Sequence, residues 1–537
     1  MSILNLILWL PLAVGLVGFA LPGRINGAWA FLGSLVSLGL AIGLAAGFDS
    51  TGSLQHVVSE SWIPDLGVRY ELGVDGLSVF LVLMASVMWA AVSAYSALQG
   101  PDRPRTYFFM LAVAQSATLG AFLAQDLLLF VLFFDLMLIP IYFLIGGWGT
   151  GERIPATIKM IVFTLVGSLL MLSAAIATAV LSSDATGGLT FSLEALRQVP
   201  LGTGSQEWIF CFFAIAFLVK MPSFPVHGWM PDAYRAAPLP VLALLGGVLS
   251  KVAAYGFLRV VLPLFPDATV HFQTLILIVA LASILYGSAM AFTQTNVRLI
   301  AGYSSVAQMG FITLGIFSLR PDGGDGAVIQ MVNHGIVVGA TFFIIALIAE
   351  RTGTADIREM GGMAKRAPVL AILFMVVTMA TLAIPGSANF VGEFYILTGV
   401  FQSKVAIALI ASTGIALAAF YALRMYQRIM HNRLPDGLVS REMTFREGVV
   451  LVPLVACIVG LAIYPGLVTT RGEAAVDRSL TSLCATEGIY SASSGSTEAA
   501  VDCPEGIPAP SGIPADSTSA AFHKGWTGYT PLAEIGQ

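Results

Sequence analysis

Residues 217–259, FLVKMPSFPVHGWMPDAYRAAPLPVLALLGGVLSKVAAYGFLR, place two lysines inside apolar runs that are each long enough to cross a lipid bilayer. Lys220 lies near the middle of the run 208–230, and a helix needs about 20 apolar residues to cross roughly 30 Å of hydrocarbon. A lysine at that depth costs at least ~2.5–3.5 kcal/mol, so we expect a function or a fixed acidic partner. Pro222 and Pro225 follow it and predict a helix broken in mid-membrane.

The composition of the whole chain indicates a membrane protein. Of 537 residues, 57% are hydrophobic and 11% are charged, with a mean hydropathy of +0.85, and so few charges cannot cover a soluble surface. The small net charge of −5, without a basic tract, argues against a nucleic-acid partner. The four cysteines lack metal-site spacing, and no GxxxxGK or strand-linked GxGxxG motif is present. We therefore expect no metal and no redox cofactor in this chain.

Fourteen runs have membrane-spanning length and predict an all-α polytopic protein. They lie at 3–21, 27–48, 75–98, 105–123, 126–148, 155–181, 207–230, 237–263, 271–292, 298–318, 326–349, 367–400, 403–430 and 446–468. The first run lacks a preceding positive region, so we interpret it as a retained helix rather than a signal peptide.

Cations concentrate in alternate loops, and the other loops hold only Arg69, Arg197, Arg320 and Lys404. This bias predicts both termini outside a bacterial cytoplasmic membrane.

A second interruption, Ile384-Pro385-Gly386-Ser387-Ala388-Asn389, lies within the overlong run 367–400. Matching breaks in two halves of a chain are typical of inverted-repeat transporters with sites at the midplane. The predicted organisation is helices 1–3 in 1–104, one five-helix repeat in 105–265, a second, inverted repeat in 266–430, a last helix with its inner loop in 431–468, and an external tail in 469–537.

The tail, 469–537, is rich in Ser, Pro, Gly, Ala and Thr. This composition predicts a segment that is flexible or laid along the outer surface. Cys484 and Cys503 both lie in it, and an oxidising compartment would permit a disulfide between them.

Five ionisable residues lie well inside apolar runs: Asp135, Lys220, Lys251, His334 and Glu393. Five such groups on five helices suggest a chain of proton-relay sites through the bilayer interior. The alternatives are structural. Lys251 follows a Gly246-Gly247 pair that suits close helix packing, and His334 has either a relay role, which its ordinary titration range suits, or that of a satisfied core residue.

Asp135 has two interpretations. It is either the counter-ion of Lys220, or a polar contact between helices or a partner of Lys159 on the next span. An anion within ~4–6 Å favours the charged form of a lysine, whereas burial disfavours it. Moving the carboxylate away would therefore push the lysine's proton onward.

Further polar residues could support such a path. Tyr142, Ser304 and Gln308, with Tyr303 and Ser305, could bridge through water or serve as ordinary hydrogen bonds between helices. His227 and Asp232 in HGWMPDAY lie near the inner end of their span, where they could line a proton entrance or cap the loop.

The motifs FFDLMLIPIYFLIGGWG, the opening stretch, NVRLIAGYSSVAQMG, VNHGIVVGATFF and PGSANFVGEF together resemble the antiporter-like membrane subunits of respiratory complex I, the proton-pumping NADH:quinone oxidoreductase. The resemblance covers roughly residues 70–430. Glu393 favours the chain M type, equivalent to NADH dehydrogenase subunit 4, because the related chains L and N carry lysine there. The lack of sequence signals for a long lateral C-terminal helix also argues against chain L.

The resemblance implies that Lys220 is the central protonatable group, that Asp135, Lys251 and His334 belong to its path, and that Glu393 is the terminal site. It also implies an outward proton flow driven by quinone reduction in neighbouring subunits, chains L and N as partners, and NADH, FMN, iron–sulfur clusters and quinone held elsewhere. Two residues depart from the family pattern: Asp135 is typically glutamate, and Gln308 is often histidine.

Three other functions remain open at this stage. The fold and lysines are shared with subunits of multi-subunit Na⁺/H⁺ antiporters and with the membrane arm of energy-converting hydrogenases. A purely structural spacer, whose buried charges only hold subunits together, is the alternative from a different class.

Overall fold

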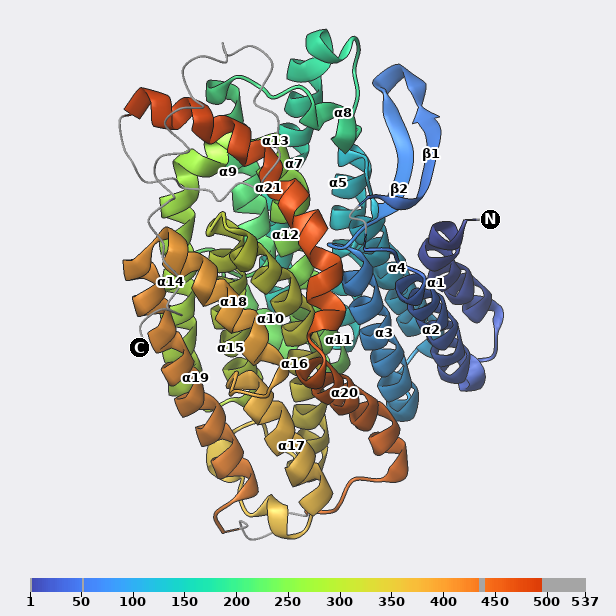
Figure 1. Cartoon of the computed structure of the whole chain (residues 1–537). Coiled ribbons are helices and arrows are strands. Elements are labelled where there is room, and N and C mark those ends of the chain that lie inside the picture. The colour runs from blue at the N-terminus through green and yellow to red at the C-terminus, as the bar shows by residue number, and fades with distance from the viewer. Residues whose placement is uncertain (1, 51–52, 434–439, 495–537) are drawn as a thin grey trace, which may run out of the picture.

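The computed structural model describes residues 2–50, 53–433 and 440–494, which form a bundle of helices with one β-hairpin at one end (Figure 1). In this part of the chain, twelve helical segments are long and apolar enough to cross a membrane. They are α1 (Ile3–Ala20), α2 (Gly23–Ala46), α3 (Val79–Gln99), α4 (Pro104–Leu123), Leu127–Trp148, α7 (Arg153–Thr186), Leu239–Leu264, α14 (Pro266–Thr293), α15 (Val297–Phe317), α16 (Pro321–Thr352), α19 (Val405–Met430) and α20 (Phe445–Ile463). The predicted count of about fourteen crossings is not confirmed, because the other two predicted runs do not form single long helices.

Those two runs are the ones in which the sequence predicts a break. The first forms α9 (Thr203–Lys220) and α10 (Met230–Ala236), and the second forms α17 (Pro368–Thr381) and α18 (Ala388–Ser403). Prolines account for the first break, since they lack the backbone donor and clash with the preceding turn. In the second, Gly386 adopts a φ of +90°, a conformation that glycine reaches without strain.

Two other segments are helical but irregular. Leu127–Trp148 consists of α5 (Leu127–Leu136) and α6 (Leu138–Trp148), and Pro140 near their junction cannot donate to Leu136. Leu239–Leu264 consists of α11 (Leu239–Leu244), π-helical η2 (Leu245–Leu249), α12 (Ser250–Gly256), π-helical η3 (Phe257–Val261) and α13 (Leu262–Leu264). Such π-helical turns often occur at functional sites.

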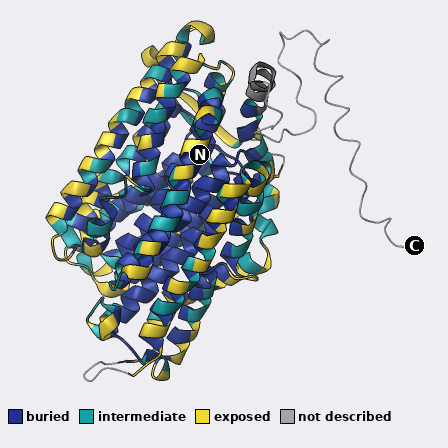
Figure 2. Ribbon diagram, turned by 90° about the vertical axis from the view of Figure 1, so that its left-hand side faces the viewer, coloured by how far each residue is buried: buried dark blue, intermediate teal, exposed yellow. Residues whose placement is uncertain are grey.

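The centre of the bundle is formed by Leu239–Leu264, α15 and α16, whose most apolar windows are entirely buried. Buried residues fill the interior in Figure 2, and exposed residues lie on the outward faces of the surrounding helices. By contrast, α1, α2 and α19 bury only a third of their windows. A bilayer or neighbouring proteins must cover those outward apolar faces.

The sequence analysis missed the β-hairpin, in which β1 (Gln55–Ile63) pairs antiparallel with β2 (Val68–Val74). It lies beyond the N-terminal end of α3 (Figure 1). The turn uses η1 (Pro64–Leu66) and then Gly67 at a φ of +65°. The remaining short elements are α8 (Leu193–Arg197), η4 (Ile357–Glu359) and η5 (Met363–Lys365).

The expectation that no long helix follows the last span is wrong, although the alternative that the tail is laid along a surface agrees with the described part of it. Helix α21 (Gly466–Ser494) is 29 residues long and crosses the bundle, packing against α13, α14 and α16 (Figure 1). The helix has a sparse apolar stripe within a mostly polar composition, which the sequence analysis did not recognise. The buried residues of this stripe are Val468, Ala475, Val476, Leu480 and Leu483. The predicted Cys484–Cys503 disulfide lies outside the described residues.

Candidate functional site

The first helix break places Lys220 inside the protein. Lys220 is the last residue of α9 and is buried. Its Nζ donates to the backbone carbonyl of Phe134, at 3.0 Å, and lies 4.4 Å from the centroid of the Phe134 ring. A cation at the C-terminal end of a helix is favoured by the helix dipole, and the ring face adds a cation–π attraction. The end of α9 is therefore a position that can hold a protonated lysine.

Asp135 is adjacent to the carbonyl that Lys220 contacts, and it is only half-buried. Its Oδ1 accepts a hydrogen bond from Ser168 on α7 at 2.5 Å. Asp135 and Lys220 interact electrostatically, yet the carboxylate oxygens lie more than 4.0 Å from the lysine Nζ, too far for a direct ion pair. In this arrangement the carboxylate is near the lysine but does not form a direct ion pair with it.

The alternative pairing of Asp135 with Lys159 is wrong, since Lys159 pairs with Asp232. Lys159 Nζ lies 2.8 Å from Asp232 Oδ2, and both side chains are more than a third exposed. Asp232 also lies 3.6 Å from Arg235. These residues form a surface network between α7 and α10, away from the buried lysine.

Lys251 is fully buried on α12. Its Nζ donates to the carbonyl of Gly246, at 2.5 Å, and to Ser250 Oγ, at 3.3 Å. Gly246 lies in the π-helical turn η2. The adjacent Gly247 approaches the backbone of Gly335 on α16 so closely that a Cβ there would lie 3.0 Å from the Gly335 carbonyl oxygen. The glycine pair thus serves close packing, as the structural interpretation proposed, and also supplies a carbonyl to the lysine.

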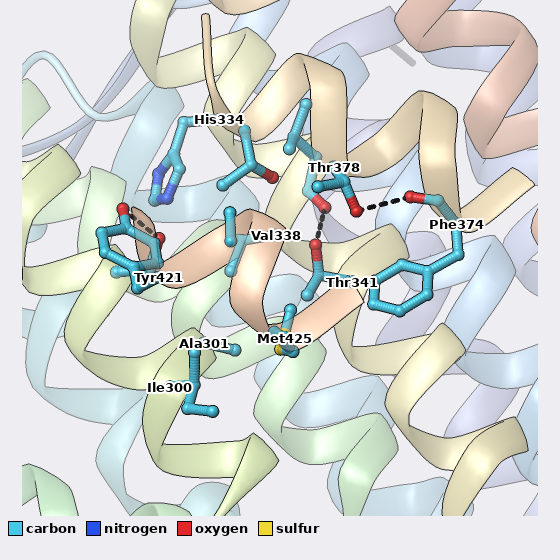
Figure 3. Close-up of a pocket in the computed structure, with 13 residues that line it drawn as sticks. Ile300, Ala301, His334, Val338, Thr341, Phe374, Thr378, Tyr421 and Met425 are labelled. Carbon is cyan, nitrogen blue, oxygen red and sulfur yellow. Dashed lines mark hydrogen bonds between the residues drawn. The ribbon is translucent and has the colours of Figure 1, made fainter. Parts of the chain in front are cut away.

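His334 lies on α16 and is the next buried titratable residue after Lys251. It is buried, interacts electrostatically with Lys251, and leaves Nδ1 without a protein hydrogen-bond partner. It lines a cavity with Thr341, Thr378 and Tyr421 (Figure 3). The centre of a water molecule can occupy about 20 Å³ of this cavity. About 10–15 Å³ of such space is enough for one water. His334 is therefore beside a space in which a water can carry a proton.

Glu393 lies on α18 after the second break and is buried. Gln308 Nε2 on α15 donates to Glu393 Oε1 at 2.8 Å, and Gln330 Nε2 on α16 donates to Gln308 Oε1 at 2.8 Å. Gly392 makes room for this chain, because a Cβ there would lie 2.3 Å from Gln330 Oε1. The three side chains form a hydrogen-bonded series across three helices. Sequence reasoning did not assign Gln330.

The region around the second break holds several buried polar atoms with no protein partner. They are Ser387 Oγ, Asn333 Oδ1 and both side-chain polar atoms of Asn389. Asn333 Nδ2 donates to the carbonyl of Ala388 at 2.6 Å. Buried polar groups are almost always hydrogen-bonded, so these atoms are suited to bind internal water between His334 and Glu393.

The accessory residues divide into two groups. Ser304 bonds to Tyr421 at 2.9 Å, and Gln308 bonds to Glu393 as described, so both lie within the buried polar region. His227 is buried in the first break with Nδ1 unpaired, 4.9 Å from the Tyr286 ring centroid. Tyr142, in contrast, is 37% exposed on α6. The structure does not bring Tyr142 to the buried residues.

The shortest ion pair between buried side chains of the described residues was not predicted. Arg259, at the end of the opening stretch, lies 2.5 Å from Asp75, and both side chains are buried. Arg259 Nε also donates to Tyr255 Oη at 2.8 Å. Burial opposes ionisation of Asp75, but the Arg259 guanidinium outweighs it and holds the pKa of Asp75 below its ordinary value. Only the presence of an arginine in an apolar run could have suggested this contact.

Comparison with known proteins places these residues in a family context. The family described as NADH:quinone oxidoreductase/Mrp antiporter, TM matches residues 124–418. NADH-quinone oxidoreductase subunit M of Rhodobacter capsulatus is 38% identical over 485 residues, covering 87% of this chain and 94% of that protein.

Two solved structures share the fold. Respiratory complex I from Thermus thermophilus with bound NADH contains a chain with a TM-score of 0.82 and 29% identity, covering 89% of this chain and 99% of that one. A chain of the Mrp complex from Dietzia sp. DQ12-45-1b has a TM-score of 0.79 at 21% identity, covering 89% of this chain and 98% of that one. The second likeness concerns the fold alone.

Proposed function

This chain belongs to the NADH-quinone oxidoreductase subunit M family, and from that premise we propose that it is a proton-translocating subunit of the membrane arm of complex I. It moves protons through buried residues and makes or breaks no covalent bond of the redox substrates. Quinone reduction in other subunits supplies the energy, and the two other antiporter-like subunits, chains L and N, are its expected neighbours. NADH, FMN, iron–sulfur clusters and quinone belong to other subunits in this proposal.

The observation that carries the proposal is the succession of titratable groups from one helix break to the other. Lys220 is held by a backbone carbonyl, Lys251 by another, and His334 interacts with Lys251 beside a water-sized cavity. Glu393 then lies beyond a group of unpaired amide atoms that suit water. Intramembrane charges of this kind are costly and therefore mark transport paths.

The position of the Asp135 carboxylate controls whether Lys220 keeps or releases its proton. When its carboxylate approaches Lys220, the ammonium form is favoured; when it withdraws, burial favours release of the proton toward Lys251. A difference of one pKa unit corresponds to about 1.4 kcal/mol, and moving one charge against 100 mV costs about 2.3 kcal/mol. A change of a few pKa units therefore suffices for one transfer step.

The direction of transfer follows from the distribution of cations. Loops rich in arginine lie at the end of the bundle opposite the β-hairpin, and the positive-inside rule assigns that end to the cytoplasm. Both termini then lie outside, and protons enter from the cytoplasm and leave beyond Glu393.

The decisive experiment is Lys220→Ala in the assembled complex. We expect quinone reduction and proton pumping to fall by about tenfold or more, with normal assembly, because the carrier of the first transfer is gone. Lys365→Ala, which removes an exposed lysine, is the matched control. Normal pumping stoichiometry in Lys220→Ala would contradict the proposal. Co-purification with an Na⁺-dependent exchanger that lacks NADH oxidation would instead favour the antiporter alternative.

A further inference from the structure

A large groove lies on the surface of the bundle, and none of the residues of the proposed proton path lines it. It has a volume of about 630 Å³ and is formed by the N-terminal turns of α2 and α20 and by the C-terminal part of α3. Its floor is made of small and apolar residues, among them Gly27, Ala28, Ala94 and Ala97. The dimensions fall within the range of small-molecule pockets, roughly 300–1,000 Å³.

Two arginines stand at the mouth of the groove. Arg24 is the second residue of α2, and Arg446 is the second residue of α20. Both are exposed and line the groove. Within the described chain, neither forms a hydrogen bond or an ion pair with another residue, unlike the nearby Arg105, which donates to the Leu21 carbonyl. Two free guanidinium groups therefore face one opening.

The backbone adds to this positive field. α2 and α20 both begin at the mouth, so two helix N-termini lie there, and such termini favour anions. The acidic residue closest in sequence to Arg446 is Glu447, and it is already paired with Arg351 at 2.9 Å. Asp102 is the one acidic residue in the loop between α3 and α4, and that loop also carries Arg103. The mouth is thus electropositive, while the floor is apolar.

The position of the groove selects the kind of ligand. Arg24 and Arg446 lie at the ends of membrane spans, the depth at which lipid headgroups meet water. Phe445 beside them is 88% exposed and Val449 is 46% exposed, which suits contact with acyl chains. Basic pockets between transmembrane helices are suited to anionic headgroups.

We propose that this groove binds one anionic phospholipid, with its phosphate between Arg24 and Arg446 and an acyl chain along the small residues of α2 and α3. The lipid fills the space between α2 and α20 and so ties the second span and the last described span to α3. This inference concerns the assembly of the chain in its membrane and does not depend on the proton path.

The test measures lipid retention by native mass spectrometry. The complex that contains the full chain is extracted in mild detergent, stripped of loosely bound lipid and titrated with phosphatidylglycerol. The double variant Arg24→Gln/Arg446→Gln should lower the apparent affinity by about tenfold or more, since each cation near a lipid surface contributes about 1 kcal/mol. Phosphatidylcholine should bind more weakly, and it should respond less to the double variant.

Two controls separate this site from general effects of charge. Arg366→Gln removes an exposed arginine from the loop before α17 and should leave phosphatidylglycerol retention unchanged. Ala28→Phe keeps both arginines but fills the groove, and it should also lower retention severalfold. Equal retention in the double variant and the wild type would overturn the proposal, and so would equal loss in Arg366→Gln. A high-yield crosslink from Ala28→Cys to a neighbouring subunit would overturn it as well, because protein would then occupy the groove.

Discussion

Two acid–base pairs in this protein are built in opposite ways. Asp75 and Arg259 are both buried and lie 2.5 Å apart, whereas Asp135 and Lys220 interact only at longer range, with each bonded to another partner. The first pair uses arginine, which cannot be deprotonated in proteins, and the second uses lysine, which changes protonation readily when buried. The closed pair is suited to hold helices together, and the open pair is suited to exchange a proton.

The surroundings of the two pairs agree with this division. Arg259 precedes Pro263, which cannot donate to the Arg259 carbonyl, and Arg197 donates to that carbonyl instead, at 3.3 Å. Arg478 on α21 adds a second cation 3.7 Å from Asp75. Asp75 thus faces two cations, and both Arg259 and its carbonyl have partners, so the site resists change. Near Lys220, the helix is interrupted and Asp135 is only partly buried, so movement there costs less.

The largest effect is expected from breaking the closed pair. Asp75→Asn leaves the buried Arg259 without its counter-ion, and removal of one partner of such a pair costs about 3–5 kcal/mol of stability. Thermal unfolding of the purified complex should show a clearly lower midpoint, with Asp65→Asn on the exposed hairpin turn as control. An unchanged midpoint would mean that the pair does not hold this end of the bundle together.

The pH dependence of the closed pair has a defined sign. Because the pKa of Asp75 lies below its ordinary value, the pair stabilises the fold fully above about pH 4, the ordinary range of an aspartate. That stabilisation is lost as the pH falls through the lowered pKa. The difference in unfolding midpoint between wild type and Asp75→Asn should therefore be constant from about pH 5 to 7 and shrink only in stronger acid.

The second largest effect is expected from making the open pair resemble the closed one. Lys220→Arg keeps a cation at the end of α9 but removes a group that can release its proton. Proton pumping should fall at least about tenfold, nearly as far as in Lys220→Ala, while assembly stays normal. Lys365→Arg is the matched control. Wild-type pumping in Lys220→Arg would show that only the charge of Lys220 matters.

A smaller effect is expected at the second break. Glu393→Gln retains an oxygen that can accept from Gln308 but removes the titratable group. Pumping should fall roughly three- to tenfold, because water bound by the nearby unpaired amides can partly replace the carrier. The complex should keep its thermal stability, and Glu60→Gln on the exposed hairpin serves as control. Lost assembly with normal turnover of the remaining complex would instead support a spacer role.

The smallest effect is expected from Arg478→Gln. Its guanidinium lies 3.7 Å from Asp75 and its side chain is 43% exposed, and such pairs contribute about 0–1 kcal/mol. The unfolding midpoint should drop only slightly and less in high salt, since exposed pairs are screened. A loss as large as that of Asp75→Asn would show that α21, rather than Arg259, provides the main anchor of Asp75.

Sequence patterns predicted both helix breaks and the burial of Lys220, Lys251, His334 and Glu393, since each depends on local chemistry: a proline or glycine in an apolar run, or an ionisable residue far from the ends of one. They did not predict the Asp75–Arg259 contact, whose partners are separated by 184 positions. They also missed α21, because a sparse apolar stripe on a polar helix becomes visible only against the surface that buries it.

The sequence by itself determined that this chain crosses a membrane many times and where its helices are interrupted, because hydrocarbon thickness and backbone hydrogen bonding act on each segment separately. Only the tertiary structure decided which charges meet. Lys159 pairs with Asp232 rather than Asp135, and Lys220 contacts a carbonyl rather than a carboxylate. Such pairings depend on how helices rotate and pack against one another, and small residues such as Gly247 and Gly392 set that packing across distant parts of the chain.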